Sequence, residues 1–438
     1  MFLKSTFIKG TFVLTASSLI TKFLGFFYRI FVSRIFTTEE IGLYQLVVPV
    51  FTLCYTLTSA GFQTALSKLT ASHFARSRKS DAINTLKFAL FWCISFSFVT
   101  MIVLQKNSIF ITKHFLNNSR CASLIIAISY ILPFSAIHSC ISGYYLGIKK
   151  TVPIAISQLL EQLIRILAVI LFYNIGLQAA LDEPICIAVF GLVLGEIFAS
   201  IYCMHTLKDE HKYFSKITTN TKSNLHSLFS FAIPLTSNRL LLNIMQSYEA
   251  ISIPHKLIQS GLSNSDALSL YGVLTGMAFP CIFFPSALTN SIASLSLSTV
   301  SGLAASHKNF KLRNFCKKSI SLCFSVGLLC FLFFLLFGKH LGQTLFNNEI
   351  AGKFICTLSF ICPFIYVNSA FISILNGLGK THYSLIINTT GSIIRIMSVF
   401  FLIPHFQIQG YLWGLLISHL FISLSSFICY HSLIKLDS

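Results

Sequence analysis

Residues 131–167 read ILPFSAIHSCISGYYLGIKKTVPIAISQLLEQLIRIL, and residues 361–397 read ICPFIYVNSAFISILNGLGKTHYSLIINTTGSIIRIM. Each stretch is an apolar run, a short basic turn and a second apolar run. A shift of 230 residues aligns the two without gaps, and it matches Pro133 with Pro363, Phe134 with Phe364, Ser139 with Ser369, Gly147 with Gly377, Lys150 with Lys380, Thr151 with Thr381, and Ile164-Arg165-Ile166 with Ile394-Arg395-Ile396. Similar apolar composition alone does not put an arginine at the same register, so the chain is predicted to contain an internal repeat.

The composition of the whole chain indicates a membrane protein. Hydrophobic residues make up 54% of the 438 residues and charged residues only 10%, whereas soluble domains carry about 25% charged residues. The net charge of +19 does not indicate a nucleic-acid partner, because the basic residues form short clusters between apolar runs, without a long basic tail. Membrane lipids are therefore the predicted surroundings of most of the chain.

A membrane-spanning helix needs about 20 mostly apolar residues. The predicted spans are 10–36, 41–66, 83–105, 121–147, 152–174, 184–206, 227–255, 268–297, 318–338, 353–377, 382–404 and 408–434. If both termini are cytoplasmic, 20 of the 32 Lys and Arg residues fall in inside segments and 6 in outside loops. Cytoplasmic loops are rich in Lys and Arg, so this bias predicts a multi-pass protein of the cell membrane with both termini inside.

The repeat unit is predicted to comprise six helices. A weaker match aligns residues 42–67 with 269–294, with Tyr44 falling on Tyr271. Because six is even, both copies enter the membrane from the same side and are related by an axis along the membrane normal. The predicted fold is all-α, with about 12 transmembrane helices in two six-helix lobes. The lobes are residues 1–210 and 227–438, and a cytoplasmic linker covers 211–226.

Charged residues inside the spans give the candidate binding site. Lys22 and Arg29 are seven residues apart, so they share one face of the first helix. Arg239 lies near the middle of the seventh helix, which is the repeat counterpart of the first. These cations are predicted to line a cavity between the lobes and to bind phosphate or diphosphate. The alternative is inter-helix pairing, for example of Arg239 with Glu249 or Glu196.

Two further arginines occupy the repeated register. Glu161 precedes Arg165 by four residues, which favours an intrahelical ion pair. Arg395 has Gly391 in the corresponding place and so lacks that local partner. The predicted substrate-binding set is Lys22, Arg29, Arg239, Glu249, Arg165 and Arg395.

Other motifs mainly exclude functions. Gly379-Lys380-Thr381 lacks the earlier glycine and the preceding strand of a nucleotide-binding loop. The cysteines form no C-x-x-C motif and lie mostly in apolar runs. The sequence therefore predicts no catalytic residues, no metal site, no cofactor and no enzymatic activity. Pro280 and Pro285 in the eighth helix and Pro363 in the tenth predict bends or hinges.

Two stretches carry a family resemblance. FIKGTFVLTASSLITKFLGFFYRIFVSRIFTTEEIGLYQLVVPVF at 7–51 and PLTSNRLLLNIMQSYEAISIPHKLIQSGLSNSDALSLYGVLTGMAFPCIFFP at 234–285 resemble the stage V sporulation protein B family of polysaccharide-biosynthesis membrane proteins. The resemblance implies a V-shaped, two-lobe transporter that moves undecaprenyl-diphosphate-linked sugars outward. It also implies a cationic central cavity. Arg29 and Arg239 approximately match the positions of the arginines that line this cavity in the family, and Lys22 lies on the same helix face as Arg29. Many relatives carry two further C-terminal helices that help to form a lipid-tail groove.

The leading functional prediction is a flippase for an undecaprenyl-diphosphate-linked oligosaccharide, such as a peptidoglycan or spore-cortex precursor or a polysaccharide repeat unit. One alternative is a cation-coupled multidrug exporter of the same multidrug/oligosaccharidyl-lipid/polysaccharide (MOP) exporter superfamily. Another is a non-transporting assembly scaffold. The sequence does not identify a coupling ion.

Overall fold

The computed structural model describes residues 2–208, 221–306 and 309–436. Eleven helices in this part of the chain are long and apolar enough to cross a membrane, or twelve when the bent pair Glu349–Ser359 and Cys362–Gly377 counts as one span. These twelve segments overlap the twelve predicted spans, although the eighth ends at Phe283 and not at residue 297, so the predicted all-α, polytopic fold is confirmed. Residues 211–220 of the predicted linker lie outside the described residues.

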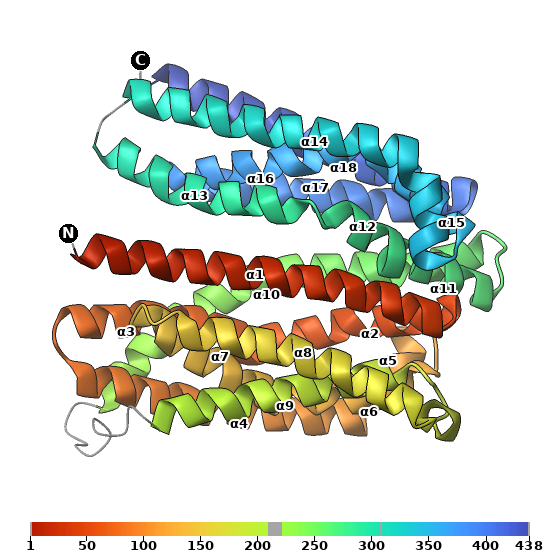
Figure 1. The fold of residues 1–438 in the computed structure, drawn as a ribbon, viewed down its shortest axis with the longest axis horizontal. Coiled ribbons are helices and arrows are strands. Elements are labelled where there is room, and N and C mark those ends of the chain that lie inside the picture. Colours follow the sequence, from red (N-terminus) through yellow and green to blue (C-terminus); the bar gives the residue numbers. More distant parts are fainter. Residues whose placement is uncertain (1, 209–220, 307–308, 437–438) are drawn as a thin grey trace. The chain divides into compact units, whose positions relative to one another are not determined.

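The helices of the first half of the chain precede residues 209–220, which lie outside the described residues (Figure 1). They are α1 (Phe2–Ile35), α2 (Thr38–Tyr55), the π-helical turn η1 (Thr56–Ala60), α3 (Gly61–Ala75), α4 (Lys79–Lys106), α5 (Ser108–His114), α6 (Cys121–Ser129), α7 (Ile131–Gly147), α8 (Val152–Asn174), the 3₁₀ turn η2 (Leu177–Ala180) and α9 (Cys186–Lys208).

The second half begins with the longest helix described. Its elements are α10 (Thr221–Gln259), α11 (Asn264–Gly272), the π-helical turn η4 (Val273–Ala278), α12 (Phe279–Phe283), α13 (Ser286–Ala305), α14 (Asn309–Phe346), α15 (Glu349–Ser359), α16 (Cys362–Gly377), α17 (Thr381–Phe401) and α18 (Ile403–Leu436).

The chain divides into two compact units. Unit 1 comprises Met1–Tyr28 and Leu43–Ser247, and unit 2 comprises Arg29–Gly42 and Tyr248–Ser438. Helices α1, α2 and α10 therefore each contribute residues to both units. The division into lobes 1–210 and 227–438 stays a prediction.

Each unit has its own buried core. In unit 1, side chains of α3, α4 and α7 pack together, with Leu66, Leu86 and Tyr144 almost fully buried. In unit 2, the core includes Cys323 of α14 and Phe371 of α16. Many outward side chains are large and apolar, such as Leu336 at 73% exposure. A lipid environment explains such surfaces, because soluble proteins rarely expose large apolar patches.

Prolines mark the bends in the spans, as the sequence predicts. The eighth span passes from α11 through η4 into α12 and is broken at Pro285 before α13 begins. The tenth span bends by 54° between α15 and α16, and Pro363 lies in the first turn of α16. A proline ring removes one backbone hydrogen bond and displaces the preceding turn. Each break therefore lies beside a proline, where the helix has fewer backbone hydrogen bonds. A gating role for these bends stays a prediction.

The start of α2 crosses α11 at a pair of glycines within unit 2. A Cβ atom added at Gly272 would lie 2.2 Å from the carbonyl oxygen of Thr38, and one added at Gly42 would lie 2.2 Å from that of Leu268. Small residues at helix contacts allow two backbones to approach closely, as at many membrane helix interfaces. The crossing therefore depends on both positions lacking a side chain.

Replacing Gly272 with alanine is expected to destabilise the protein by about 1–3 kcal/mol, because the new methyl group overpacks against backbone atoms that cannot move away. The matched control is Gly302→Ala in α13, where an added Cβ meets no atom within 4 Å. Unfolding in mixed detergent micelles, followed by circular dichroism, measures both variants. Equal stabilities of the two would contradict the proposed tight crossing.

Candidate substrate-binding site

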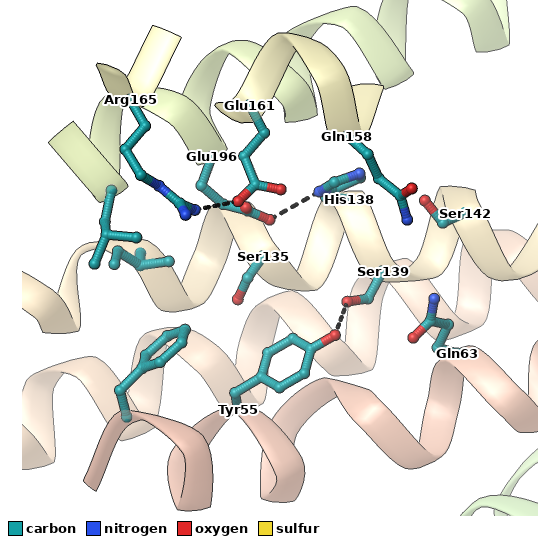
Figure 2. A pocket seen from close by; sticks show the side chains of 13 residues that line it. Tyr55, Gln63, Ser135, His138, Ser139, Ser142, Gln158, Glu161, Arg165 and Glu196 are labelled. Atoms are coloured by element: carbon teal, nitrogen blue, oxygen red, sulfur yellow. Dashed lines mark hydrogen bonds and ion pairs between the residues drawn. The ribbon is translucent and has the colours of Figure 1, made fainter. Parts of the chain in front are cut away.

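A cavity of ≈ 290 Å³ lies inside unit 1. Its walls come from α2, α3, α7, α8 and α9 (Figure 2). The volume is near the lower end of the range for small-molecule sites. Most of the labelled side chains are polar, which is unusual for the interior of a membrane-spanning bundle and marks this cavity as the candidate site.

One wall carries a hydrogen-bonded chain of titratable and hydroxyl groups. Nδ1 of His138 lies 3.0 Å from a carboxylate oxygen of Glu196, and Nε2 of His138 lies 3.0 Å from Oγ of Ser157. Ser157 donates its own proton to the carbonyl oxygen of Ile154 at 2.9 Å. Nε2 of His138 must therefore be the donor to Ser157. The hydrogen bond between Nδ1 and the Glu196 carboxyl group then requires one proton, which resides either on the imidazole or on the carboxyl group.

The same wall contains the predicted intrahelical ion pair. Arg165 of α8 donates through Nη2 to Glu161, and through Nη1 to Oε1 of Gln162 at 3.0 Å. The side chains of Arg165 and Glu161 are 19% and 22% exposed. The predicted Glu161–Arg165 pair is thus confirmed, and both members line the cavity.

An aromatic surface forms the opposite wall. Phe51 and Tyr55, one turn apart on α2, have stacked rings with centroids 6.1 Å apart. The Tyr55 hydroxyl forms a 2.8 Å hydrogen bond with Oγ of Ser139. In Figure 2, Tyr55 lies across the cavity from Glu161 and Glu196. The π-helical turn η1 follows Tyr55 directly, and such bulges frequently occur at functional sites.

The cavity brings together three side chains of types that bind metal ions. One ligand atom from each of His138, Glu161 and Glu196 lies within 4.8 Å of the others. However, Arg165 already holds Glu161, and His138 already holds Glu196. The guanidinium of Arg165 is a fixed positive charge bound to one of the three ligands, so the arrangement does not fit a resident metal.

Lys22 and Arg29 are both exposed on α1, as expected from their shared face. Lys22 lies near the middle of the span Val13–Ile35. It forms no hydrogen bond or ion pair with any residue that the structure describes. Lys22 is thus a mid-span cation without a protein counter-ion in the described chain.

Arg239 contacts backbone and hydroxyl oxygens of unit 1. Its Nη1 donates to the carbonyl oxygen of Ala60, and its Nη2 donates to Oγ1 of Thr64, both at 3.0 Å. These oxygens lie at the end of η1 and in the first turn of α3. Arg239 therefore ties α10 to the π-helical turn. Its predicted role in substrate binding stays a prediction.

Glu249 and Arg395 meet each other inside unit 2. Nε of Arg395 lies 2.9 and 3.0 Å from the two carboxylate oxygens of Glu249. The Tyr411 hydroxyl donates to Glu249 at 2.8 Å. The two repeat-related arginines thus use different acids, one on its own helix and one on α10. Substrate binding by Glu249 and Arg395 stays a prediction.

The predicted substrate-binding set leaves out most of the polar residues that line the cavity, chiefly Tyr55, His138, Gln158 and Glu196. Of these, the sequence offered Glu196 only as a partner for Arg239. A usable signal was present, because His138, Glu161 and Glu196 are titratable residues in three successive spans. Whether these three side chains face one cavity depends on the rotation of each helix about its own axis. The hydropathy of the sequence does not reveal that rotation.

Comparison with known proteins agrees with this architecture. Residues 7–262 match the family described as polysaccharide biosynthesis protein. Stage V sporulation protein B of Bacillus subtilis (strain 168) is 26% identical over 416 residues, covering 93% of this chain and 80% of the relative. Lipid II flippase MurJ of the same organism is 22% identical over 332 residues, covering 71% of this chain and 60% of the relative.

A solved structure has the same fold. An inward-facing multidrug resistance MATE family transporter of the MOP superfamily superposes with a TM-score of 0.76 at 14% identity, covering 95% of each chain. The membrane-spanning helices, the fold shared with this transporter and the family match over more than half of the sequence lead to one conclusion: this chain is a multi-pass membrane protein of the polysaccharide biosynthesis protein family.

Proposed function

We propose that the protein is a flippase that moves an undecaprenyl-diphosphate-linked glycan across the cytoplasmic membrane by alternating access. The proposal rests chiefly on one observation: Lys22 is a mid-span cation without a counter-ion among the described residues. A charged side chain at mid-span costs about 2.5–3.5 kcal/mol in lipid, so such residues face water or an ionic partner. An ammonium group without a described counter-ion suits a phosphate of the substrate as a point charge.

Two further observations support the proposal. Arg29 lies two turns after Lys22 on the same helix, where a guanidinium can bind phosphate oxygens in bidentate fashion. Among the relatives are a protein named for sporulation and one named lipid II flippase. Both termini are proposed to be cytoplasmic, on the distribution of Lys and Arg between loops.

The second candidate is a cation-coupled multidrug exporter. The carboxylates of Glu161 and Glu196 in the cavity favour it, and so does the fold shared with a multidrug resistance transporter. The engagement of Glu161 by Arg165 weighs against it, because a guanidinium beside the carboxylate repels an organic cation.

Native mass spectrometry of the purified protein distinguishes the two candidates. The protein is titrated separately with undecaprenyl diphosphate, phosphatidylglycerol and ethidium. Saturable binding of undecaprenyl diphosphate, at concentrations where phosphatidylglycerol does not bind, is the expected result. Binding of ethidium alone would replace the flippase proposal with the exporter.

A further inference from the structure

We propose that the cavity in unit 1 is a sugar subsite, which receives one pyranose ring of the lipid-linked glycan. The inference rests on the proposed flippase function and adds the chemistry that this cavity recognises. It follows from the polar groups left unpartnered in the cavity, from its charge balance, from its aromatic wall and from its position beside α1.

Several polar groups of the residues that line the cavity have no hydrogen-bond partner among the described residues. Ser142 is only 4% exposed, and its Oγ has no hydrogen-bond partner among the described residues, although it lines the cavity. Nε of Arg165 is likewise buried without a described partner. The amides of Gln63 and Gln158 line the cavity without a described side-chain hydrogen bond. Buried polar groups in native proteins are nearly always paired, so the buried Ser142 and Arg165 atoms and the half-buried amides leave hydrogen-bonding capacity for a polar ligand.

The charges of the cavity exclude strongly ionic ligands. Glu161 carries a carboxylate and Glu196 shares one proton with His138, so neither acid attracts a phosphate or diphosphate group. Arg165 contributes a fixed cation, which repels a quaternary ammonium or a cationic dye. A neutral ligand avoids both penalties and still uses the remaining hydrogen-bonding capacity of the charged groups.

A pyranose ring combines the required properties. Each of its hydroxyl groups donates one hydrogen bond and accepts up to two, which matches amides, a serine hydroxyl and carboxylate oxygens. Its C–H face is apolar and packs on an aromatic ring. The stacked pair of Phe51 and Tyr55 supplies that surface, and Tyr55 lies opposite the polar wall (Figure 2).

The position of the cavity suits a glycan that is attached to a diphosphate. Gly25 of α1 faces Gln162 of α8, since a Cβ atom added at Gly25 would lie 3.7 Å from Nε2 of Gln162. Lys22 precedes Gly25 by one helical turn. Gln158 and Arg165 flank Gln162 by one turn on either side and line the cavity. A diphosphate at Lys22 would thus present its first sugar toward this part of α8.

The test compares a lipid with and without a sugar. Native mass spectrometry gives the dissociation constants of undecaprenyl diphosphate and of undecaprenyl-diphosphate-N-acetylglucosamine, and free N-acetylglucosamine is titrated in parallel. The variant is Ser142→Ala combined with Gln158→Ala, and the matched control is Ser97→Ala. Ser97 also has a buried, unpartnered Oγ, but it does not line the cavity.

Wild type and Ser97→Ala are expected to prefer the glycosylated lipid by about tenfold, from the added hydrogen bonds. The double variant is expected to lose this preference while binding undecaprenyl diphosphate as wild type does. Neither Ser142 nor Gln158 has a described side-chain hydrogen bond, so the double variant should not lower the unfolding temperature, which separates lost recognition from misfolding.

Three outcomes would overturn the sugar subsite. They are an equal affinity of wild type for both lipids, a preference that survives in the double variant, and free N-acetylglucosamine binding as tightly as the lipid-linked form. If wild type bound neither lipid, the flippase proposal itself would fail. The two failures are therefore distinguishable.

Discussion

Lys22→Glu is expected to weaken the binding of undecaprenyl diphosphate by about 10- to 100-fold, since a hydrogen bond to a charged group is worth roughly 1.5–3 kcal/mol and each 1.4 kcal/mol is tenfold. The substitution removes the ammonium group and places a carboxylate at mid-span on α1, where it repels the substrate phosphates. Because Lys22 has no partner among the described residues, no internal ion pair is broken by the change.

Two controls give this prediction its specificity. Lys22→Arg keeps the positive charge and is expected to retain binding. Lys106→Glu makes the same change of net charge at the exposed end of α4 and is expected to bind as wild type does. Titrations by native mass spectrometry provide the dissociation constants. If Lys22→Glu and Lys106→Glu lost affinity equally, the effect would be one of net charge, and Lys22 would not contact the diphosphate.

Glu249→Leu is expected to destabilise the protein by about 3–5 kcal/mol, because it leaves the buried guanidinium of Arg395 without its counter-ion. The side chains of Glu249 and Arg395 are only 7% and 13% exposed. Ser392 and Ser418 also accept hydrogen bonds from this guanidinium, at 3.1 and 3.4 Å, but neither carries a negative charge.

The double variant Glu249→Leu with Arg395→Met tests the cause. A buried ion pair replaced by apolar side chains is often neutral in stability, so the double variant is expected to be more stable than Glu249→Leu alone. Glu349→Gln is the matched control, because Glu349 lies exposed in the first turn of α15. Its expected cost is below about 1 kcal/mol.

Unfolding in mixed detergent micelles, followed by circular dichroism, measures these variants. A double variant no more stable than Glu249→Leu alone would show that the unpaired charge of Arg395 is not the cause of the instability.

The sequence by itself determined the membrane-spanning segments, the proline bends and the Glu161–Arg165 pair. Each depends on interactions over short sequence distances. A span is set by the hydropathy of about 20 consecutive residues. The prolines at 285 and 363 act on the helix in which they lie, through a missing N–H group. A pair four residues apart is fixed by the helical repeat alone.

Only the tertiary structure decided which side chains from different spans meet. Glu249 and Arg395 are 146 residues apart, and the contact of Arg239 with Ala60 spans 179 residues. The sequence offered Glu249 as a partner for Arg239, and neither residue's described contacts include the other. The cavity in unit 1 likewise needs five elements at fixed rotations. Hydropathy specifies that a helix crosses the membrane, but helix–helix packing decides which of its faces meets another helix, and thereby which polar groups share a cavity.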